Sequence, residues 1–326
     1  MAPCVVDRVE IVQAMNITVV LCTYNRCQSL AKALKSLAAL QLPEADEWEI
    51  LVVDNNSTDE TREVTQDFCR RHPGHFRYLF EPRPGKSHAL NAAIREARGD
   101  VLAFIDDDVM VESTWLRNLV APLHNGPWAG SGGRILPDRT FVPPPWLSLE
   151  GRYALAPLAL FDRGPDAGEL TEAPFGTNMA FHKGVFERYA GFRTDLGPHP
   201  DGGGPQKSED SEFGCRLLAA GERLRYEPSA VVYHSVPPHR LQKKYFLTWW
   251  YEKARADTRA FGIETGTRWF LGPIPLYFIR RLAVWTLRWM VALSPRERFS
   301  CKLKVWGLGG SVTECRQRNA LPAGGR

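Results

Sequence analysis

The sequence lacks several features that would assign the protein to a class at once. Its seven cysteines form no C-x-x-C pair and no metal-finger spacing, a usage that fits a reducing compartment. The first residues, MAPCVVDRVEIVQAMN, lack the basic start and apolar run of a signal peptide. Positive charge is not in excess, because 41 Lys and Arg stand against 37 Asp and Glu, and a net charge of +4 argues against nucleic acid as the main partner. We therefore expect a cytoplasmic protein.

Long uncharged apolar runs are also absent, which matters most near the C-terminus. The segment 271–293 is apolar, but Arg280, Arg281 and Arg288 interrupt it, and charges near the centre of a membrane span are costly. Its Trp, Tyr and Arg content is typical of helices that lie in the membrane interface. A basic and aromatic helix is predicted before it, over residues 243–261. The two helices indicate either peripheral association with the inner face of the cell membrane or packing on the rest of the protein, and the sequence favours neither.

What the sequence does contain is a repeated alternation of apolar strands and helices. Strands are predicted at ITVVLC (17–22), EILVVD (49–54), FRYLFE (76–81) and VLAFI (101–105). Continuous apolar strands that alternate with helices indicate an α/β fold with a mostly parallel sheet, whose ligands bind at the carboxyl ends of the strands. The Gly- and Pro-rich stretch 125–172 predicts loops around a pocket, and the Gly-rich loop 197–206 is predicted to be mobile.

Three adjacent aspartates, Asp106, Asp107 and Asp108, follow the fourth of these strands. Their carboxylates repel one another unless cations or hydrogen-bond donors compensate, and Mg²⁺ and Mn²⁺ prefer carboxylate and phosphate oxygens. Alternation along an extended backbone would put Asp106 and Asp108 on one side and Asp107 on the other. A solvated acidic turn that caps the next helix is the alternative. Polar loops at two equivalent strand ends favour a composite site.

Several motifs extend this pattern along the chain. VVLCTYNR, LVVDNNSTDET, PRPGKSHALNAAI, FIDDD, GTNMAF and SEDSEFGCRL occur in that order. Together they resemble a family 2 glycosyltransferase of the GT-A fold, over roughly residues 17 to 236. The resemblance implies a Rossmann-like, mixed and mostly parallel sheet flanked by helices. It divides the chain into an N-terminal extension (1–16), a GT-A domain (17–238) and a C-terminal helical region (239–326).

The resemblance also implies an activity and its site residues. The activity is a metal-dependent, inverting transfer of a sugar from a nucleoside-diphosphate-sugar to an acceptor hydroxyl of a glycan, a lipid-linked saccharide or an exopolysaccharide precursor. The residues expected to bind the nucleotide-sugar are Thr23, Tyr24, Arg26, Asp54, Arg83, Lys86, Asp106, Asp107, Gly176 and Asn178. The ligands expected for Mg²⁺ or Mn²⁺ are Asp106, Asp108 and His234. Asp210 is expected to take the acceptor's proton, with Glu209 in reserve.

Simpler structural roles exist for several of these residues. Asp54 suits a turn and helix cap, Lys86 suits an ordinary exposed lysine, and acidic residues such as Asp210 are common at a helix start. The order and spacing of the motifs favour the functional interpretation.

Two other functions compete with sugar transfer. A sugar-phosphate nucleotidyltransferase would normally carry a Gly-rich basic loop early in the chain, where this sequence reads CTYNRCQSL. A non-catalytic nucleotide-sugar-binding protein would keep the donor site and recruit partners through its C-terminal helices. Asp106, Asp108 and Asp210 argue against that second alternative, although a misplaced loop would silence the site without changing a residue.

Overall fold

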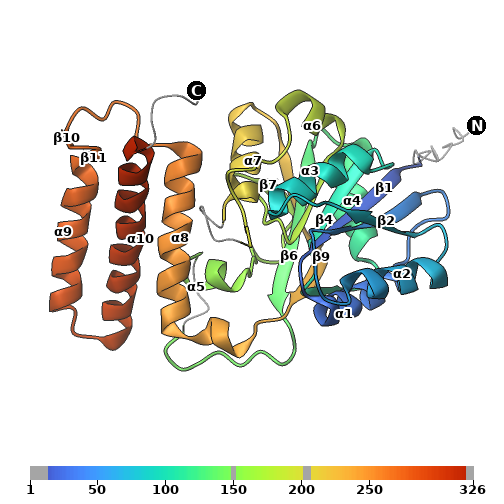
Figure 1. The fold of residues 1–326 in the computed structure, drawn as a ribbon, viewed down its shortest axis with the longest axis horizontal. Coiled ribbons are helices and arrows are strands. Elements are labelled where there is room, and N and C mark those ends of the chain that lie inside the picture. Colours follow the sequence, from blue (N-terminus) through green and yellow to red (C-terminus); the bar gives the residue numbers. More distant parts are fainter. Residues whose placement is uncertain (1–13, 148–151, 201–206, 321–326) are drawn as a thin grey trace, which may run out of the picture.

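The computed structural model describes residues 14–147, 152–200 and 207–320 (Figure 1). The strands are β1 Asn16–Thr23, β2 Glu47–Asp54, β3 Phe76–Phe80, β4 Val101–Asp106, β5 Val109–Val111, β6 Gly130–Pro137, β7 Gly168–Leu170, β8 Asn178–His182, β9 Leu224–His234, β10 Phe270–Leu271 and β11 Ile274–Pro275. The helices are α1 Cys27–Leu37, α2 Thr61–Arg71, α3 Lys86–Glu96, α4 Trp115–Asn125, α5 Arg152–Leu155, α6 Gly184–Tyr189, α7 Glu209–Ala219, α8 Lys243–Phe261, α9 Leu276–Val291 and α10 Pro295–Ala320, with 3₁₀ turns η1 Ala156–Leu158 and η2 Pro238–Leu241. All four predicted strands are present.

One mixed sheet forms the centre of the N-terminal part of the chain, up to His234. Its order is β3-β2-β1-β4-β8-β6-β9-β5, with β7 added on β9. Strands β3, β2, β1 and β4 are parallel, whereas β8 runs antiparallel to β4 and β6. Because β1 pairs with β2 on one side and β4 on the other, the chain switches direction across the sheet at β1, where α/β folds form their ligand crevice. The predicted mixed, mostly parallel α/β sheet is confirmed.

Helices cover both faces of this sheet, which explains why its strands are apolar throughout. Consecutive residues Val19, Val20 and Leu21 of β1 are all fully buried, as expected for a strand covered on both sides. Helices α1 and α2 lie on one face of the sheet, and α3 with α6 lies on the other (Figure 1). Helix α1 buries Leu30, Ala33, Leu34 and Leu37, the helical stripe that predicted it.

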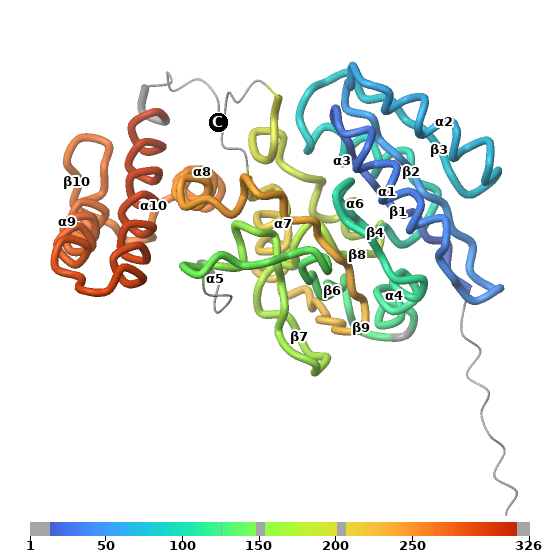
Figure 2. The backbone as a smooth tube through the Cα atoms, turned by 90° about the horizontal axis from the view of Figure 1, so that it is seen from below, coloured from blue at the N-terminus to red at the C-terminus, as the bar shows by residue number. Residues whose placement is uncertain are grey.

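Beyond the sheet, α8, α10 and α9 stand side by side, with α10 in the middle (Figures 1 and 2). Helix α8 spans the residues predicted for it. It is joined to α10 by Glu314, whose fully buried carboxylate accepts a 2.6 Å hydrogen bond from Nε of Arg259. The hydroxyls of Tyr251 and Thr313 add a 2.9 Å bond between the same helices.

Helix α9 packs on α10, away from the sheet. It leaves large apolar side chains exposed, among them Leu287 (59%), Met290 (61%) and Val291 (63%). This segment therefore packs on α10 and not on the sheet, and its association with a membrane surface stays a prediction. Across residues 14–147, 152–200 and 207–320, no helix is long and apolar enough to cross a membrane.

Candidate active site

The carboxyl ends of β1, β2 and β4 meet at one edge of the sheet because the strands are in register. Thr23 pairs with Asp54 across β1 and β2, and Cys22 pairs with Asp106 across β1 and β4. Strand β4 ends at Asp106, so Asp107 and Asp108 lie in a turn. The side-chain alternation predicted for an extended backbone therefore does not apply to them.

The end of β1 and the loop that follows it hold Asp107 and Asp108 in place. Oγ1 of Thr23 donates a 2.7 Å hydrogen bond to Asp107, and one guanidinium nitrogen of Arg26 lies 3.1 Å from both Asp107 and Asp108. Burial raises the pKa of Asp107 to about 6, although Arg26 opposes the shift. Thr23 and Arg26 thus bind the aspartate cluster directly.

Lys86 and Thr177 hold the first aspartate of the cluster. Nζ of Lys86 lies 2.6 Å from Oδ1 of Asp106, and Oγ1 of Thr177 donates to Oδ2 at 2.7 Å. Burial disfavours the charged carboxylate, but the ammonium of Lys86 outweighs it and lowers the pKa of Asp106. Lys86, whose side chain is 22% exposed, is therefore a partly buried partner of Asp106 and not the exposed lysine that the sequence left open.

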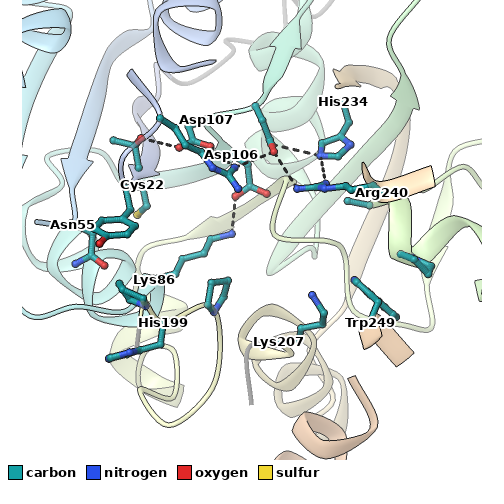
Figure 3. A pocket seen from close by; sticks show the side chains of 18 of the residues that line it. Cys22, Asn55, Lys86, Asp106, Asp107, His199, Lys207, His234, Arg240 and Trp249 are labelled. Carbon is teal, nitrogen blue, oxygen red and sulfur yellow. Dashed lines mark hydrogen bonds and ion pairs between the residues drawn. The ribbon is translucent and has the colours of Figure 1, made fainter. Parts of the chain in front are cut away.

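His234 and Arg240 lie across the cavity from Cys22 and Asn55 (Figure 3), and both contact Asp108. Because Val109 of β5 pairs with His234 of β9, the imidazole lies beside the aspartate turn, with Nε2 3.5 Å from Oδ1 of Asp108. Arg240 contacts both, at 3.1 Å from the imidazole Nε2 and 3.5 Å from Asp108. Burial raises the pKa of Asp108, but His234, Arg240 and Arg26 together bring it below its usual range.

These groups suit a hard divalent cation that takes few protein ligands. Arg240 donates to Nε2 of His234, so the lone pair of that atom is directed at the guanidinium, and Nδ1 is buried without a hydrogen-bond partner. In the described part of the chain, no three His, Cys, Asp or Glu side chains are placed so that they could hold a metal ion together. Mg²⁺ characteristically uses one or two carboxylates and takes its remaining oxygens from water and substrate phosphates. The carboxylates of Asp108 and Asp106 fit that donor set, whereas His234 would join it only with Arg240 displaced from Nε2.

The start of α7 supplies two more carboxylates on the opposite side of Lys86. Asp210 accepts hydrogen bonds from the backbone N–H of Gly176 (2.8 Å) and of Ser211 (2.7 Å). Glu209 is buried, and its Oε1 lies 3.7 Å from Nζ of Lys86. Burial and the neighbouring Asp210 raise the pKa of Glu209 to about 7.

Two adjoining cavities occupy this region. The first, of about 380 Å³, is lined by the predicted site residues Thr23, Tyr24, Arg26, Lys86, Asp106, Asp107, Asp108 and His234. The second, of about 430 Å³, is lined by Glu209 and Asp210. Both linings include Ala159, Pro198, Lys207 and Trp249, so the cavities meet at these residues. The first cavity thus contains the aspartate cluster, and the second contains the carboxylates at the start of α7.

Comparison with known proteins gives this site its context. The family model described as Glycosyl transferase family 2 matches residues 18–189, more than half of the chain. The chain belongs to glycosyltransferase family 2. It is therefore an enzyme of the glycosyltransferase class, as the motifs predicted.

Two relatives illustrate which named proteins this glycosyltransferase is similar to in sequence. The succinoglycan biosynthesis protein ExoM of Rhizobium meliloti (strain 1021) is 26% identical over 228 residues, which cover 70% of this chain and 69% of ExoM. A poly-beta-1,6-N-acetyl-D-glucosamine synthase of Staphylococcus epidermidis is 31% identical over 227 residues, covering 69% of this chain and 51% of the relative. Both names refer to polysaccharide biosynthesis or synthesis.

Solved structures confirm the GT-A fold. A mannosyltransferase of Pyrobaculum calidifontis, in complex with GDP-Man and Mn²⁺, aligns with a TM-score of 0.56 at 20% identity, covering 96% of this chain and 77% of its own. TarS 1-349 of S. aureus, in complex with UDP-GlcNAc, aligns with a TM-score of 0.51 at 16% identity, covering 94% and 92%. At these identities the likeness establishes the fold of the glycosyltransferase.

Four of the residues predicted to bind the nucleotide-sugar do not line either cavity of this glycosyltransferase. Among the described residues, neither cavity lining includes Asp54, Arg83, Gly176 or Asn178. Asp54 is buried and accepts hydrogen bonds from the Ser57 N–H and the Tyr78 hydroxyl, the turn-capping role that the sequence left open.

The other three have structural partners of their own. The guanidinium of Arg83 binds Glu81 at 2.8 Å and 2.9 Å. Fully buried Asn178 binds the Trp115 indole and two backbone carbonyls, and so ties β8 to its neighbours. Gly176 contributes its N–H to Asp210. Their predicted contacts with the nucleotide-sugar remain predictions.

Other residues of the site were not among those predicted to bind the nucleotide-sugar. Asn55 lines the first cavity. Its side-chain amide holds the loop between β3 and α3, because it binds the Arg83 carbonyl oxygen and the Gly85 N–H. Its position beside Asp54 at a strand end could have indicated it. Lys207 and Trp249 lie far along the chain, and no local pattern distinguishes them from other Lys and Trp residues.

Proposed function

We propose that this family 2 glycosyltransferase moves a sugar from a nucleoside-diphosphate-sugar to an acceptor hydroxyl by a single, inverting displacement. The observation that carries the proposal is the pair of adjoining cavities, one lined by the aspartate cluster and basic side chains, the other by Asp210. The donor occupies the first cavity and the acceptor the second, so that the anomeric carbon lies where the two meet.

The first cavity has the charges that a departing nucleoside diphosphate requires. Mg²⁺ or Mn²⁺, held by Asp108 and Asp106, would supply Lewis-acid neutralisation of the leaving phosphates. Arg240 and Lys207 line the same cavity and add positive charge to it. The donor would thus meet cationic groups on several sides.

Asp210 acts as the general base in this proposal, with Glu209 in reserve. Two backbone N–H groups orient the Asp210 carboxylate, which retains free lone pairs for a hydroxyl proton. Glu209 faces Lys86 instead and takes part in the charge balance around Asp106. Cys22 also lines the donor cavity, but burial raises the pKa of its thiol, which makes it a poor nucleophile for a covalent intermediate. One base and one displacement give inversion.

The acceptor belongs to saccharide assembly in this proposal, as a glycan, a lipid-linked saccharide or an exopolysaccharide precursor. The names of the relatives support it, including a glucosyl-dolichyl phosphate glucuronosyltransferase of Haloferax volcanii that is 27% identical over 233 residues. A non-catalytic binding role fits less well, and the support for catalysis is that Asp210 accepts a hydrogen bond from the Gly176 N–H and lines the cavity that adjoins the proposed donor site.

A titration with nucleotides tests the donor half of the proposal. Wild-type protein is titrated calorimetrically with a panel of nucleoside diphosphates, with Mn²⁺ and with EDTA. We expect one nucleotide to bind markedly tighter in Mn²⁺, because a cation held at Asp108 would neutralise the charge of the diphosphate. Absence of binding to every nucleotide under both conditions would overturn the donor assignment.

The charge and the exposed apolar side chains of the C-terminal helices suit attachment of the enzyme to a membrane surface. Between residues 262 and 320 the sequence has ten Lys or Arg and three Asp or Glu, a local excess that complements anionic lipid. Helix α9 adds exposed apolar side chains, and its Trp285 is contacted by Arg288 and Lys304. This is the composition of a helix lying in the membrane interface. Peripheral attachment would bring the enzyme to a lipid-linked acceptor.

Flotation with liposomes tests this attachment. We expect the full-length protein to float with vesicles that contain anionic lipid and to remain behind with neutral ones. The double change Leu287→Glu and Met290→Glu should abolish flotation, because it places charge on the apolar face of α9. Val142→Glu, at a side chain that is 76% exposed elsewhere, serves as the control and should float. If the wild-type protein does not float with anionic vesicles, the attachment is wrong.

A further inference from the structure

One face of α8 lines the second cavity along most of the helix. Trp249, Lys253, Asp257 and Phe261 all belong to the lining, and they recur at every fourth position. Residues with this spacing lie on the same face of a helix. At 1.5 Å per residue, the stretch from Trp249 to Phe261 is about 18 Å long. The wall is therefore longer than a single pyranose ring.

The opposite wall begins at the proposed catalytic centre. Asp210 and Ser211, at the start of α7, and Phe175, before β8, face the same cavity. Trp249 and Lys207 line both cavities, and Nζ of Lys207 lies 5.1 Å from the centre of the Trp249 ring. The groove between α7 and α8 thus starts beside the first cavity and continues away from it, towards Phe261.

Helix α8 is fixed against α7, so the groove is a built feature. Oγ of Ser208 donates a 2.9 Å hydrogen bond to Oδ1 of Asp257, and the same oxygen lies 2.5 Å from Nζ of buried Lys253. On its far side α8 packs along α10, through the Arg259–Glu314 pair. The face of α8 that lines the groove is therefore held in one position from both sides.

The groove has the chemistry of a saccharide site. Half-buried Trp249 lies at its inner end and Phe261, 51% exposed, at its outer end, and aromatic faces are suited to the apolar face of a sugar ring. Polar groups between them can exchange hydrogen bonds with hydroxyls. The acidic side chains Glu172, Glu209, Asp210 and Asp257 outnumber the lysines Lys207 and Lys253. Such a lining disfavours uronate or phosphate groups and accepts uncharged sugars.

We propose that the α8 face formed by Trp249, Lys253, Asp257 and Phe261 binds the acceptor as an uncharged oligosaccharide, whose terminal hydroxyl reaches Asp210. The inference rests on the proposed function, since it takes the second cavity as the acceptor side. It extends the catalytic unit through α8, past the boundary at residue 238 predicted from the sequence and past the residues that the family model matches. Chain length and charge would then be selected by a helix outside the conventional domain.

Saccharide binding to the full-length protein tests this inference. Protein saturated with Mn²⁺ and the nucleoside diphosphate that binds is titrated with neutral oligosaccharides, from disaccharides to hexasaccharides, of glucose, galactose, mannose and N-acetylhexosamines. Matched uronate-containing chains are titrated in parallel, and binding is followed by saturation-transfer NMR. We expect neutral chains to bind more tightly as they lengthen, and uronate chains to bind more weakly at every length.

Two variants and a matched control locate the site. Phe261→Ala should weaken binding of the longer chains by roughly tenfold and leave disaccharides nearly unchanged, whereas Trp249→Ala should weaken all of them. Phe80→Ala removes a phenylalanine of similar exposure (48%) that belongs to neither lining, and it should bind saccharides like the wild type.

Nucleotide binding, measured on the same samples, separates failure of this inference from failure of the proposed function. If the nucleotide binds but no neutral chain does, or if both aromatic variants bind saccharides like the wild type, the α8 groove is not the acceptor site. If uronate chains bind more tightly than neutral ones, the uncharged class is wrong. If no nucleotide binds, the proposed function itself fails.

Discussion

Replacing Asp210 by asparagine is expected to lower kcat for sugar transfer by about 10²–10⁴-fold, the usual contribution of a positioned general base. The KM for the donor should change little, because Asp210 lines the acceptor cavity. Asparagine keeps the size of the side chain and one of the two oxygens that accept from the N–H groups of Gly176 and Ser211, so only one of these hydrogen bonds is lost and the fold should survive. Initial rates over a range of donor concentrations measure both constants.

Two further variants test whether the loss of activity is specific to Asp210. Asp195→Asn alters an exposed carboxylate paired with Arg193, outside both cavity linings, and should keep wild-type rates. Glu209→Gln removes the partner of Lys86 and tests the reserve candidate. Full activity in Asp210→Asn, together with a large loss in Glu209→Gln, would transfer the role of base to Glu209.

Replacing Asp108 by asparagine should lower kcat by about 10²–10⁴-fold as well, since a bound metal contributes several kcal/mol of charge stabilisation. It should also remove the Mn²⁺ dependence of nucleotide binding, which Asp210→Asn should leave intact. Asparagine avoids leaving a cavity next to His234 and Arg240, both of which contact this carboxylate. Calorimetric titration with and without Mn²⁺ measures this second effect.

The thermal stability of the Asp108 variant provides the structural control. A melting temperature close to the wild-type value, combined with lost Mn²⁺ dependence, assigns the defect to the metal. Retained Mn²⁺ dependence in a folded Asp108→Asn protein would show that the cation is held elsewhere.

Local sequence pattern accounts for the central architecture. The apolar runs at β1, β2 and β4 are continuous because helices cover both faces of the sheet, so these runs and the polar loops after them were enough to place the strands. The polar residues at their ends meet because parallel strands in register end at one edge, as the pairing of Cys22 with Asp106 shows. That much of the donor side follows from the sequence.

Contacts between side chains that are far apart in the sequence could not be predicted from the sequence. Thr23 contacts Asp107, although they are 84 positions apart, and Lys86 connects Asp106 with Glu209. Each of these contacts depends on tertiary packing that no motif records. The same holds for Trp249, whose place between the cavities is set by how α8 docks on α7.

Helix α10 lies in the region 239–326 that was predicted to be helical, but its bounds were not predicted, for a reason visible in its sequence. Gly307, Gly309 and Gly310 lower the intrinsic preference for a helix. At Gly310 a Cβ would collide with the carbonyl oxygen of Tyr251, so close packing against α8 requires glycine there. Tertiary contact thus overrides local preference.

The stereochemistry of transfer tests the central claim most directly. The wild-type enzyme, Mg²⁺ or Mn²⁺, the α-linked nucleotide sugar whose nucleotide binds best and a neutral oligosaccharide acceptor are combined, and the anomeric proton of the first-formed product is followed by NMR. A single displacement assisted by Asp210 predicts a β-linked product that forms only with the metal. An α-linked product, or equal rates in EDTA, would contradict the account.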